Sequence, residues 1–452
     1  MKILITGAAG FLGSHLSEKY VLDKHLVYGV DNLMNGNLNN VRTLLHKKNF
    51  KFIRGDIALN EVYSKLPNDF DAIFHLAAQI HVDRSIVNPE ETFKINLGGT
   101  LKILEYARMN DIDKILFSST SEVYGSAEYA PMDESHPLSA KHPYGVSKIA
   151  ADRLCYTYNE TYDLGVDIIR CFNFFGPRQK DTGYGGVIAI FINRVLQNKP
   201  PIIYGDGKQS RDYMFVKDAV YAYDTVLRSK GNPGKNGINF GSGKEISIKE
   251  IADMVIKHGT RDNNLRPIHV EPRPVEVQRL IADISKAKKL LQFKPKIQFE
   301  KGLALLIDWY RNYKSELWLY YQIFQMTIKK VLATGSKGFV GRQLSRRLKE
   351  VGFHVVTTAK NRKLIDLTNV DQFPTIENVN AIVYLAAKTS ISDSFGEPHK
   401  AYFTNKLGTL NVLGFARIRN IKQLIYASTY VYGEPQYLPI DEKHVVNPPF
   451  SL

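Results

Sequence analysis

Cysteine is scarce in this sequence, where Cys155 and Cys171 are the only two among 452 residues. Two cysteines cannot hold a metal cluster, and a disulfide is not expected in a reducing compartment, so we predict that both are core residues. No apolar run approaches the roughly 20 residues of a membrane-spanning helix. The chain also enters the strand-like segment KILITG at once, without a signal peptide. These absences predict a cytoplasmic protein without metal or membrane contact.

Acidic residues are fewer than basic ones, at 45 against 60, which leaves a formal net charge of +15. The lysines and arginines are scattered along amphipathic segments and form no block, so we expect no binding to nucleic acid. A basic surface also suits a small substrate that carries a diphosphate. The chain is 44% hydrophobic, which is typical of a globular protein, and its length predicts two or three domains.

Strand-like apolar runs alternate with helical patterns over about the first 175 residues. The runs are KILITG, LVYGVD, FIRGDI, DAIFHLAA, KILFSST and VDIIRCFN. This alternation predicts an α/β fold with a doubly wound parallel sheet. After Pro177 the pattern loosens into glycine-rich and proline-rich connections with shorter helices. We therefore predict a smaller substrate-binding region, mainly at about 176–210 and 242–313, on the carboxyl edge of the sheet.

A second copy of the first domain follows a connector. KKVLATGSKGFVG repeats KILITGAAGFLG, AIVYLAAK repeats AIFHLAAQ, and Gly335 follows Gly7 by 328 residues. We therefore predict a unit at 1–313, an aromatic-rich connector at 314–326 and a partial, duplicated domain at 327–452. Because Met326 stands where a start codon would stand, two adjacent reading frames joined end to end are a second interpretation.

Three glycines in TGAAGFLG, namely Gly7, Gly10 and Gly13, stand between a strand and a helix. Glycine lets the backbone turn tightly and approach a pyrophosphate, which then lies at the positive N-terminus of the helix. Asp31 ends the second strand 18 residues after Gly13, where a carboxylate accepts hydrogen bonds from ribose hydroxyls and repels a 2′-phosphate. We expect Asp56, which closes the next strand, to meet the adenine edge. This pattern predicts NAD as the cofactor.

The second copy keeps Gly335, Gly338 and Gly341. Eighteen residues after Gly341, however, stands Ala359, and basic residues follow it at Lys360, Arg362 and Lys363. If this copy binds a dinucleotide, we expect NADP.

Tyr144 and Lys148 are four residues apart in PYGVSK. On a helix this spacing puts both side chains on one face, where the ammonium favours the ionised phenol. A lowered tyrosine pKa makes a general base usable near neutral pH. The same spacing also occurs on solvated helix faces, so the surrounding motifs have to decide between the two interpretations.

Seven ordered motifs cover residues 1 to about 313: TGAAGFLG, HLAA, FKINLGGT, SSTSEVYG, PYGVSK, RCFNFFGPRQ and YGDGKQSRDYMFVKD. In this order they resemble the extended short-chain dehydrogenase/reductase family, and within it the NAD-dependent nucleotide-sugar epimerases and dehydratases. The resemblance implies a Rossmann sheet, bound NAD and a nucleotide-diphosphate sugar as substrate. It also implies a homodimer formed through the helix that bears Tyr144.

The same resemblance implies roles for individual residues. Tyr144 would take the proton from the sugar's 4-hydroxyl, Lys148 would bind the nicotinamide ribose, and Thr120 would hydrogen-bond the same sugar oxygen. The substrate would be held by Asn173, Arg178, Arg211 and Arg273. The cofactor would be contacted by Gly7, Gly10, Phe11, Leu12, Gly13, Asp31, Asn32, Asp56, Ile57, Leu76, Ala77, Ala78, Asn96, Tyr144 and Lys148.

Ser121 and Glu122 leave open the reaction that comes after oxidation of carbon 4. A 4-ketone acidifies the proton on carbon 5, and Glu122 stands where the 4,6-dehydratases have the base that removes it. Their usual Thr-Asp-Glu triplet is Thr-Ser-Glu here, with Ser121 in place of the acid, a form similar to that of GDP-mannose dehydratases and UDP-glucuronate decarboxylases. Two later segments, YGDGKQSRDYMFVKDAV and EVQRLIADISKAKKLL, look more like those of UDP-glucose 4-epimerases and decarboxylases. We favour a 4,6-dehydratase, with a 4-epimerase as the alternative and a decarboxylase third.

The second copy is predicted to be non-catalytic. Alignment of the repeats places Ser428, Thr429 and Tyr430 on residues 120–122 and Phe450 on Tyr144. A phenyl ring has no proton to exchange, and no lysine follows to match Lys148. The copy also lacks the later strands, which leaves a sheet edge uncovered. An NADP-binding module, an assembly module and a disrupted reading frame are the three hypotheses for it.

Overall fold

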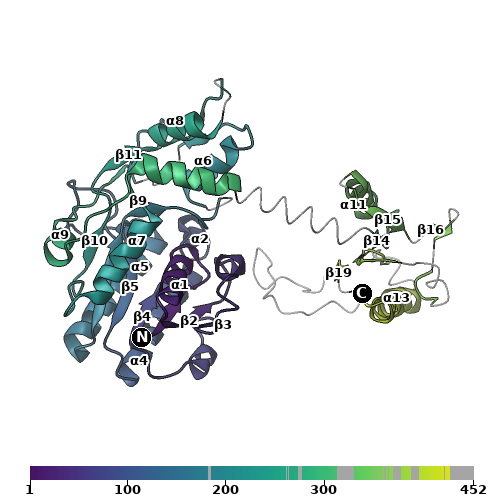
Figure 1. Ribbon diagram of the computed structural model, residues 1–452, viewed down its shortest axis with the longest axis horizontal. Coiled ribbons are helices and arrows are strands. Elements are labelled where there is room, and N and C mark those ends of the chain that lie inside the picture. Colours follow the sequence, from purple (N-terminus) through teal and green to yellow (C-terminus); the bar gives the residue numbers. More distant parts are fainter. Residues whose placement is uncertain are drawn as a thin grey trace. The chain divides into compact units, whose positions relative to one another are not determined.

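The computed structural model describes residues 1–181, 185–260, 262, 264–272, 277–312, 330–350, 352–357, 359–360, 363–364, 366–369, 378–387, 397–421 and 423–427. The chain divides into two compact units, 1–312 and 313–452 (Figure 1). The predicted connector at 314–326 lies outside the described residues.

A seven-stranded parallel sheet in the order β10-β6-β5-β4-β1-β2-β3 forms the centre of the first unit. Its strands are β1 (Lys2–Thr6), β2 (Leu26–Asp31), β3 (Phe50–Arg54), β4 (Ala72–His75), β5 (Ile115–Thr120), β6 (Val166–Cys171) and β10 (Ile238–Phe240). The chain runs outward from β1 to β3 and then returns to β4 on the other side of β1. The strand order therefore reverses between β1 and β4, which opens a crevice at their carboxyl ends. The predicted doubly wound parallel sheet is confirmed.

Helices cover both faces of this sheet, which is why its strands read as continuous apolar runs. Ile3 and Ile5 of β1 belong to a core shared with helices α1, α6 and α7, whereas Leu4 between them belongs to a core shared with α4 and α5. The helices are α1 (Phe11–Leu22), α2 (Val82–Val87), α3 (Pro89–Phe93), α4 (Gly99–Met109), α5 (Pro143–Tyr162), α6 (Val187–Val195), α7 (Val216–Arg228), α8 (Ile248–Gly259) and α9 (Ser285–Leu291). Figure 1 shows α1 and α7 side by side in front of the strands.

Smaller sheets extend the first unit beyond the large one. Strand β9 pairs with β7, β11 and β13, and β8 pairs with β12. These strands are β7 (Asn173–Phe175), β8 (Ile202–Tyr204), β9 (Ser210–Phe215), β11 (Glu245–Ser247), β12 (Ile268–Val270) and β13 (Arg279–Leu280). Because β7 follows β6 after one residue, it carries the chain directly from the carboxyl edge of the large sheet into this region.

The second unit repeats the first half of the large sheet. Its parallel strands have the order β15-β14-β18-β19, which corresponds to β2-β1-β4-β5. The elements are β14 (Lys330–Ala333), α11 (Phe339–Glu350), β15 (His354–Thr357), β16 (Ala359–Lys360), β17 (Lys363–Leu364), β18 (Ala381–Tyr384), α13 (Pro398–Ile418) and β19 (Gln423–Tyr426). Residues 428–430 and 450, on which the prediction of an inert second site depends, lie outside the described residues.

One buried threonine has the same contacts in both units. Thr6 Oγ1, at the end of β1, accepts hydrogen bonds at 3.1 Å from the backbone N–H groups of residues 76 and 77. Thr334 Oγ1, at the equivalent position after β14, accepts the same pair from residues 385 and 386, at 3.0 and 3.2 Å. Each threonine therefore ties the loop after the neighbouring strand to the start of the glycine-rich turn.

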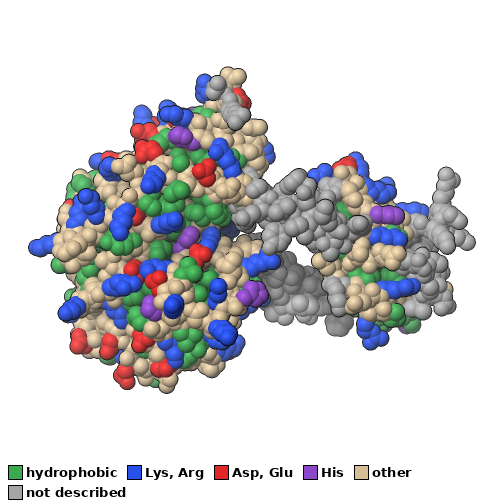
Figure 2. Space-filling view, in the orientation of Figure 1, with side chains coloured by type: hydrophobic (Ala, Val, Ile, Leu, Met, Phe, Trp, Pro, Cys, Tyr) green, Lys and Arg blue, Asp and Glu red, His purple; other side chains and the backbone are tan. Residues whose placement is uncertain are grey.

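The described residues bear on the predictions made from composition. None of their helices is both long enough and apolar enough to span a membrane. They also contain no group of three or more His, Cys, Asp and Glu side chains that could hold a metal ion. Cys155 and Cys171 are both buried and free, as predicted for core residues. In Figure 2 the lysine and arginine side chains of the first unit are spread over the visible face and interrupted by acidic ones.

Candidate active site

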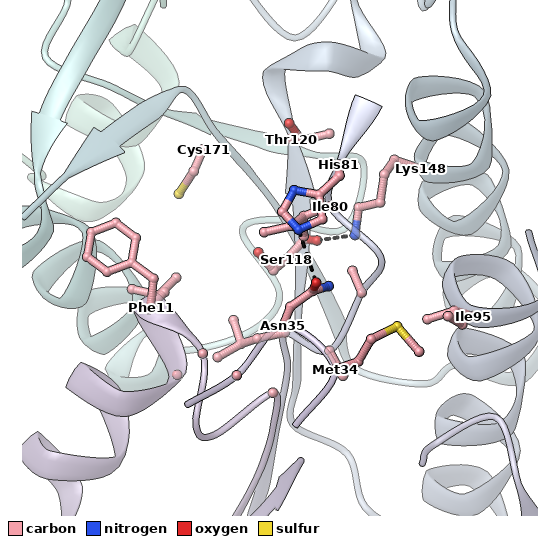
Figure 3. Close-up of a pocket in the computed structure, with 18 of the residues that line it drawn as sticks. Phe11, Met34, Asn35, Ile80, His81, Ile95, Ser118, Thr120, Lys148 and Cys171 are labelled. Carbon is pink, nitrogen blue, oxygen red and sulfur yellow. Dashed lines mark hydrogen bonds between the residues drawn. The ribbon is translucent and has the colours of Figure 1, made fainter. Parts of the chain in front are cut away.

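A cavity of about 410 Å³ lies at the carboxyl edge of the large sheet. It is lined by Gly7 after β1, Asp31 at the end of β2, Leu76 after β4, Thr120 at the end of β5 and Phe172 after β6. Five strands therefore supply its wall at the point where the strand order reverses, which is where open α/β sheets bind ligands. Figure 3 shows the cavity from Phe11 on one side to Ile95 on the other.

The glycine-rich turn has little or no room for a side chain at its glycine positions. Gly7 has φ +71°, and a Cβ there would lie 3.0 Å from the backbone nitrogen of Ala77. A Cβ on Gly13 would lie 2.1 Å from the carbonyl oxygen of Gly7. Helix α1 starts directly after Gly10, which provides no side-chain cap, so its first N–H groups are open toward the cavity. This turn and helix end fit the pyrophosphate of a dinucleotide.

Asp31 stabilises the turn as well as facing the cavity. Its carboxylate accepts hydrogen bonds from the backbone N–H of Ala9 at 2.9 Å and of Leu33 at 2.7 Å. Each oxygen keeps a lone pair for a ribose hydroxyl. Burial raises the pKa of Asp31. Next to it, Asn32 Nδ2 donates to Asp56 Oδ2 at 3.0 Å, so both polar residues are held at the same end of the cavity.

Every residue predicted to contact the cofactor lines this cavity except Asn96. Asn96 is buried behind the wall, where its Oδ1 accepts from the backbone N–H of Gln79 at 2.8 Å. Its Nδ2 donates to the carbonyl of Gln79 at 2.9 Å and to Ser147 Oγ at 3.0 Å. These hydrogen bonds position the loop at Gln79 and helix α5, and the direct contact of Asn96 with the cofactor stays a prediction.

Tyr144 and Lys148 lie in the first turns of α5 and are both buried. Lys148 Nζ donates to the carbonyl of Ser118 at 2.5 Å, the contact drawn in Figure 3, and lies 4.4 Å from the centroid of the Phe117 ring. Burial lowers the pKa of Lys148 to about 8. Burial also raises the pKa of Tyr144 to about 12, although a hydrogen bond with Thr120 lowers it. The predicted lowering of the Tyr144 pKa by Lys148 is thus contradicted, since burial of the phenol raises this pKa and the lowering contribution comes from Thr120.

Glu122 lines the same cavity as Tyr144. It belongs to a single 3₁₀ turn, Ser121–Val123, which Thr120 caps by accepting a hydrogen bond from the Glu122 N–H at 3.3 Å. The negative charge of Glu122 raises the pKa of Tyr144, so the two side chains interact electrostatically. His142 donates from Nε2 to Glu122 Oε2 at 3.2 Å. Sequence reasoning did not identify His142, although its place directly before Pro143, at a helix start, is a signal for a capping residue.

The predicted substrate residues are dispersed. Asn173 lines the cavity, and its buried Oδ1 has no hydrogen-bond partner among the described residues. Arg178 is outside the lining and pairs with Glu18 at 2.6 Å. Arg211, on β9, is also outside the lining and donates to the carbonyl of Ser210. Arg273 lies outside the described residues. Of the three members that the structure describes, only Asn173 lies at the cavity wall.

Two further polar residues at the cavity were missed from the sequence. Asn35 Oδ1 lies 3.0 Å from His81 Nε2, so the loop after β2 and the loop before α2 meet across the cavity (Figure 3). Gln179 lines the cavity with a buried Oε1 that has no partner among the described residues. Neither residue is part of a spacing pattern, and each gains its position from loops that meet only in the folded chain.

Comparisons with known proteins agree with this architecture. Residues 4–306 match the family model of GDP-mannose 4,6 dehydratase, and residues 331–451 match that of the NAD dependent epimerase/dehydratase family. The chain is 34% identical to a UDP-glucose 4-epimerase from Mycolicibacterium smegmatis, over 69% of this chain and 99% of that protein. It is 35% identical to a UDP-N-acetyl-alpha-D-glucosaminuronate decarboxylase from Bacillus cytotoxicus, over 70% and 99%. The dTDP-glucose 4,6-dehydratase DesIV of Streptomyces venezuelae, solved with NAD bound, superposes with a TM-score of 0.65 at 30% identity, over 70% of this chain and 98% of that one.

Proposed function

Since this chain belongs to the NAD-dependent epimerase/dehydratase family of nucleotide-sugar enzymes, we propose that its first unit is a 4,6-dehydratase of a nucleotide-diphosphate hexose. Its relatives include epimerases and decarboxylases as well as dehydratases, so the family alone does not choose among these reactions. The choice depends on the chemistry available to the residues around the sugar after carbon 4 has been oxidised.

NAD is the cofactor of the family, and the cavity fits it. Gly7, Gly10 and Gly13 leave room for the pyrophosphate, and Asp31 offers lone pairs to the adenosine ribose. Bound NAD supplies the acceptor for the hydride from carbon 4 of the sugar. Lys148, whose ammonium donates to the Ser118 carbonyl, would bind the nicotinamide ribose.

Tyr144 is the proposed base for the 4-hydroxyl. The phenol is buried at the cavity wall, which Thr120 also lines, and Thr120 lowers its pKa, so we propose that both side chains meet one sugar oxygen. Removal of the hydroxyl proton leaves a 4-ketone once the hydride has departed. The remaining question is the fate of the proton on carbon 5, which the ketone makes acidic.

The presence of Glu122 at the same cavity wall is the observation that carries the dehydratase proposal. Its carboxylate can take the proton from carbon 5 and pass it to the 6-hydroxyl, so that the bond between carbon 6 and oxygen breaks and water leaves. The hydride would then be delivered to carbon 6, and the proton that Tyr144 took from the 4-hydroxyl would go to carbon 5. The product is a 4-keto-6-deoxy sugar nucleotide plus one water.

The test is Glu122→Gln in the full chain, incubated with dTDP-glucose, UDP-glucose and GDP-mannose. We expect the variant to form no 4-keto-6-deoxy product by NMR while the substrate still reduces bound NAD. Normal turnover of this variant would reject the dehydratase. It would instead favour the 4-epimerase, because an epimerase only rotates the ketone and returns the hydride, and the similarity to a UDP-glucose 4-epimerase supports that second candidate.

For the second unit we propose a non-catalytic module that holds NADP. A Cβ on Gly341 would lie 2.1 Å from the carbonyl oxygen of Gly335, as a Cβ on Gly13 would from that of Gly7, so the same turn is closed to side chains. Ala359 stands in the sequence position of Asp31 and is followed by basic residues, which suit a 2′-phosphate. In the full chain, Gly341→Val should abolish NADP binding in calorimetry and leave NAD binding intact, whereas Gly13→Val should do the reverse. Equal loss in both variants would contradict a second site.

A further inference from the structure

His142 is the residue directly before helix α5 and caps its first turn. The ring is buried, and Nδ1 accepts a hydrogen bond at 3.0 Å from the backbone N–H of Gly145. A backbone N–H can only donate, so Nδ1 carries no proton in this contact. The proton of the neutral imidazole is therefore on Nε2.

That second nitrogen points at Glu122. The Nε2–H donates to Glu122 Oε2 at 3.2 Å, and the two side chains are 7% and 21% exposed. Glu122 Oε2 is the acceptor of this hydrogen bond. The helix cap and the carboxylate contact thus require the same ring tautomer and the same ring orientation.

Packing restricts the ring further. The imidazole is parallel to the Tyr144 ring, with a centroid distance of 6.0 Å and an interplanar angle of 7°. A Cβ on Gly145 would lie 3.1 Å from His142 Cε1 and 3.0 Å from the carbonyl oxygen of Glu122. The absence of a side chain at position 145 therefore lets α5, the imidazole and the 3₁₀ turn of Glu122 approach one another closely.

We propose that His142 is a positioning residue that holds the Glu122 carboxyl group in one orientation, toward the carbon 5 proton of the sugar. This inference rests on the proposed dehydratase function. Glu122 is on a single 3₁₀ turn and has several rotamers available, so an external contact is needed to limit them. His142 supplies that contact from the same helix that carries Tyr144, which links the geometry of the two proton-transfer steps.

The experiment compares His142→Asn with the matched control His136→Asn in the full chain. An asparagine at position 142 can still cap the helix, because its Oδ1 accepts from a backbone N–H, but its short side chain cannot also reach Glu122. His136 is another buried histidine before α5, and its ring contacts the backbone of Glu128 and Pro137. Two steps are followed with dTDP-glucose, UDP-glucose and GDP-mannose: reduction of bound NAD, and exchange of the carbon 5 hydrogen with deuterated water.

We expect His142→Asn to slow carbon 5 exchange and water loss by about 10- to 100-fold, the effect of misplacing a reacting group, while NAD reduction changes by less than about twofold. His136→Asn should change neither step. The double variant Glu122→Gln/His142→Asn should be no slower than Glu122→Gln alone, because the histidine acts through the carboxylate.

Three outcomes would overturn the proposal, and they are distinguishable. If His142→Asn slows both steps equally, the histidine serves only the fold of α5. If it slows neither step while Glu122→Gln stops elimination, the dehydratase function stands and the positioning role fails. If Glu122→Gln turns over normally, the proposed function fails and the role of His142 fails with it.

Discussion

Replacement of Lys148 by methionine should remove activity without reducing stability. Methionine has a similar length and shape but no charge. In the structure the Lys148 ammonium is buried, which lowers its pKa from 10.5 to about 8. The folded chain therefore carries a penalty for the charged form that the unfolded chain does not. Because Lys148 is proposed to hold the nicotinamide ribose, the same variant should lose turnover.

The size of this penalty follows from the shift in pKa. A difference of about 2.5 units at about 1.4 kcal/mol per unit corresponds to about 3 kcal/mol at pH 7. Methionine relieves this penalty but leaves the Ser118 carbonyl without its donor, which costs about 1–3 kcal/mol. At pH 7 the variant should therefore be as stable as the wild type or more stable by up to about 2 kcal/mol.

The pH dependence has a definite sign. The folded pKa of Lys148 lies below the unfolded one, so between about pH 8 and 10.5 the unfolded chain binds more protons, and wild-type stability rises with pH relative to the variant. The penalty is complete below about pH 8 and falls to about 1 kcal/mol at about pH 9.5. The advantage of Lys148→Met should thus shrink by about 2 kcal/mol from pH 7 to pH 9.5.

Urea unfolding of the full chain and of Lys148→Met, at about pH 7 and about pH 9.5, measures this difference. Turnover of the three sugar nucleotides is measured on the same samples. The reasoning would be refuted if the variant were destabilised by more than about 2 kcal/mol at pH 7, or if the difference between the two proteins did not change with pH.

Three other changes have clear expectations. Tyr144→Phe should lower carbon 4 oxidation by about 100- to 10,000-fold, the usual contribution of a general base, with NAD affinity within about threefold of wild type; unchanged NAD reduction by substrate would reject Tyr144 as the base. Gly13→Val should weaken NAD binding by more than about 100-fold, because its Cβ would overlap the Gly7 carbonyl, and calorimetry would contradict this if the affinity stayed within about tenfold. Asn96→Leu should destabilise the first unit by about 2–4 kcal/mol, because buried backbone groups of Gln79 lose their partners; a variant as stable as wild type in urea would show that this loop is held by other contacts.

Residues that act through their backbone were predictable from the sequence. Gly7 and Gly13 are needed because a Cβ would collide with the neighbouring chain, and their spacing between a strand and a helix carries that information. Asp31 acts through its side chain but was also predictable, since it ends a strand at a recognisable distance from the glycines. For Asn96 the motif identified a polar residue but not the direction of its side chain, which the buried contacts with Gln79 and Ser147 determine.

The sequence by itself determined the alternation of strands and helices, the duplication, the glycine-rich turns and the Tyr144–Lys148 pair. All of these can be read from spacing within a segment or, for the duplication, from the comparison of two segments of the sequence. Only the tertiary structure decided that burial raises the Tyr144 pKa, that Arg178 and Arg211 lie away from the cavity wall, and that His142 contacts Glu122. Desolvation and contacts between separate elements depend on how those elements pack, and no single segment of the chain contains that information.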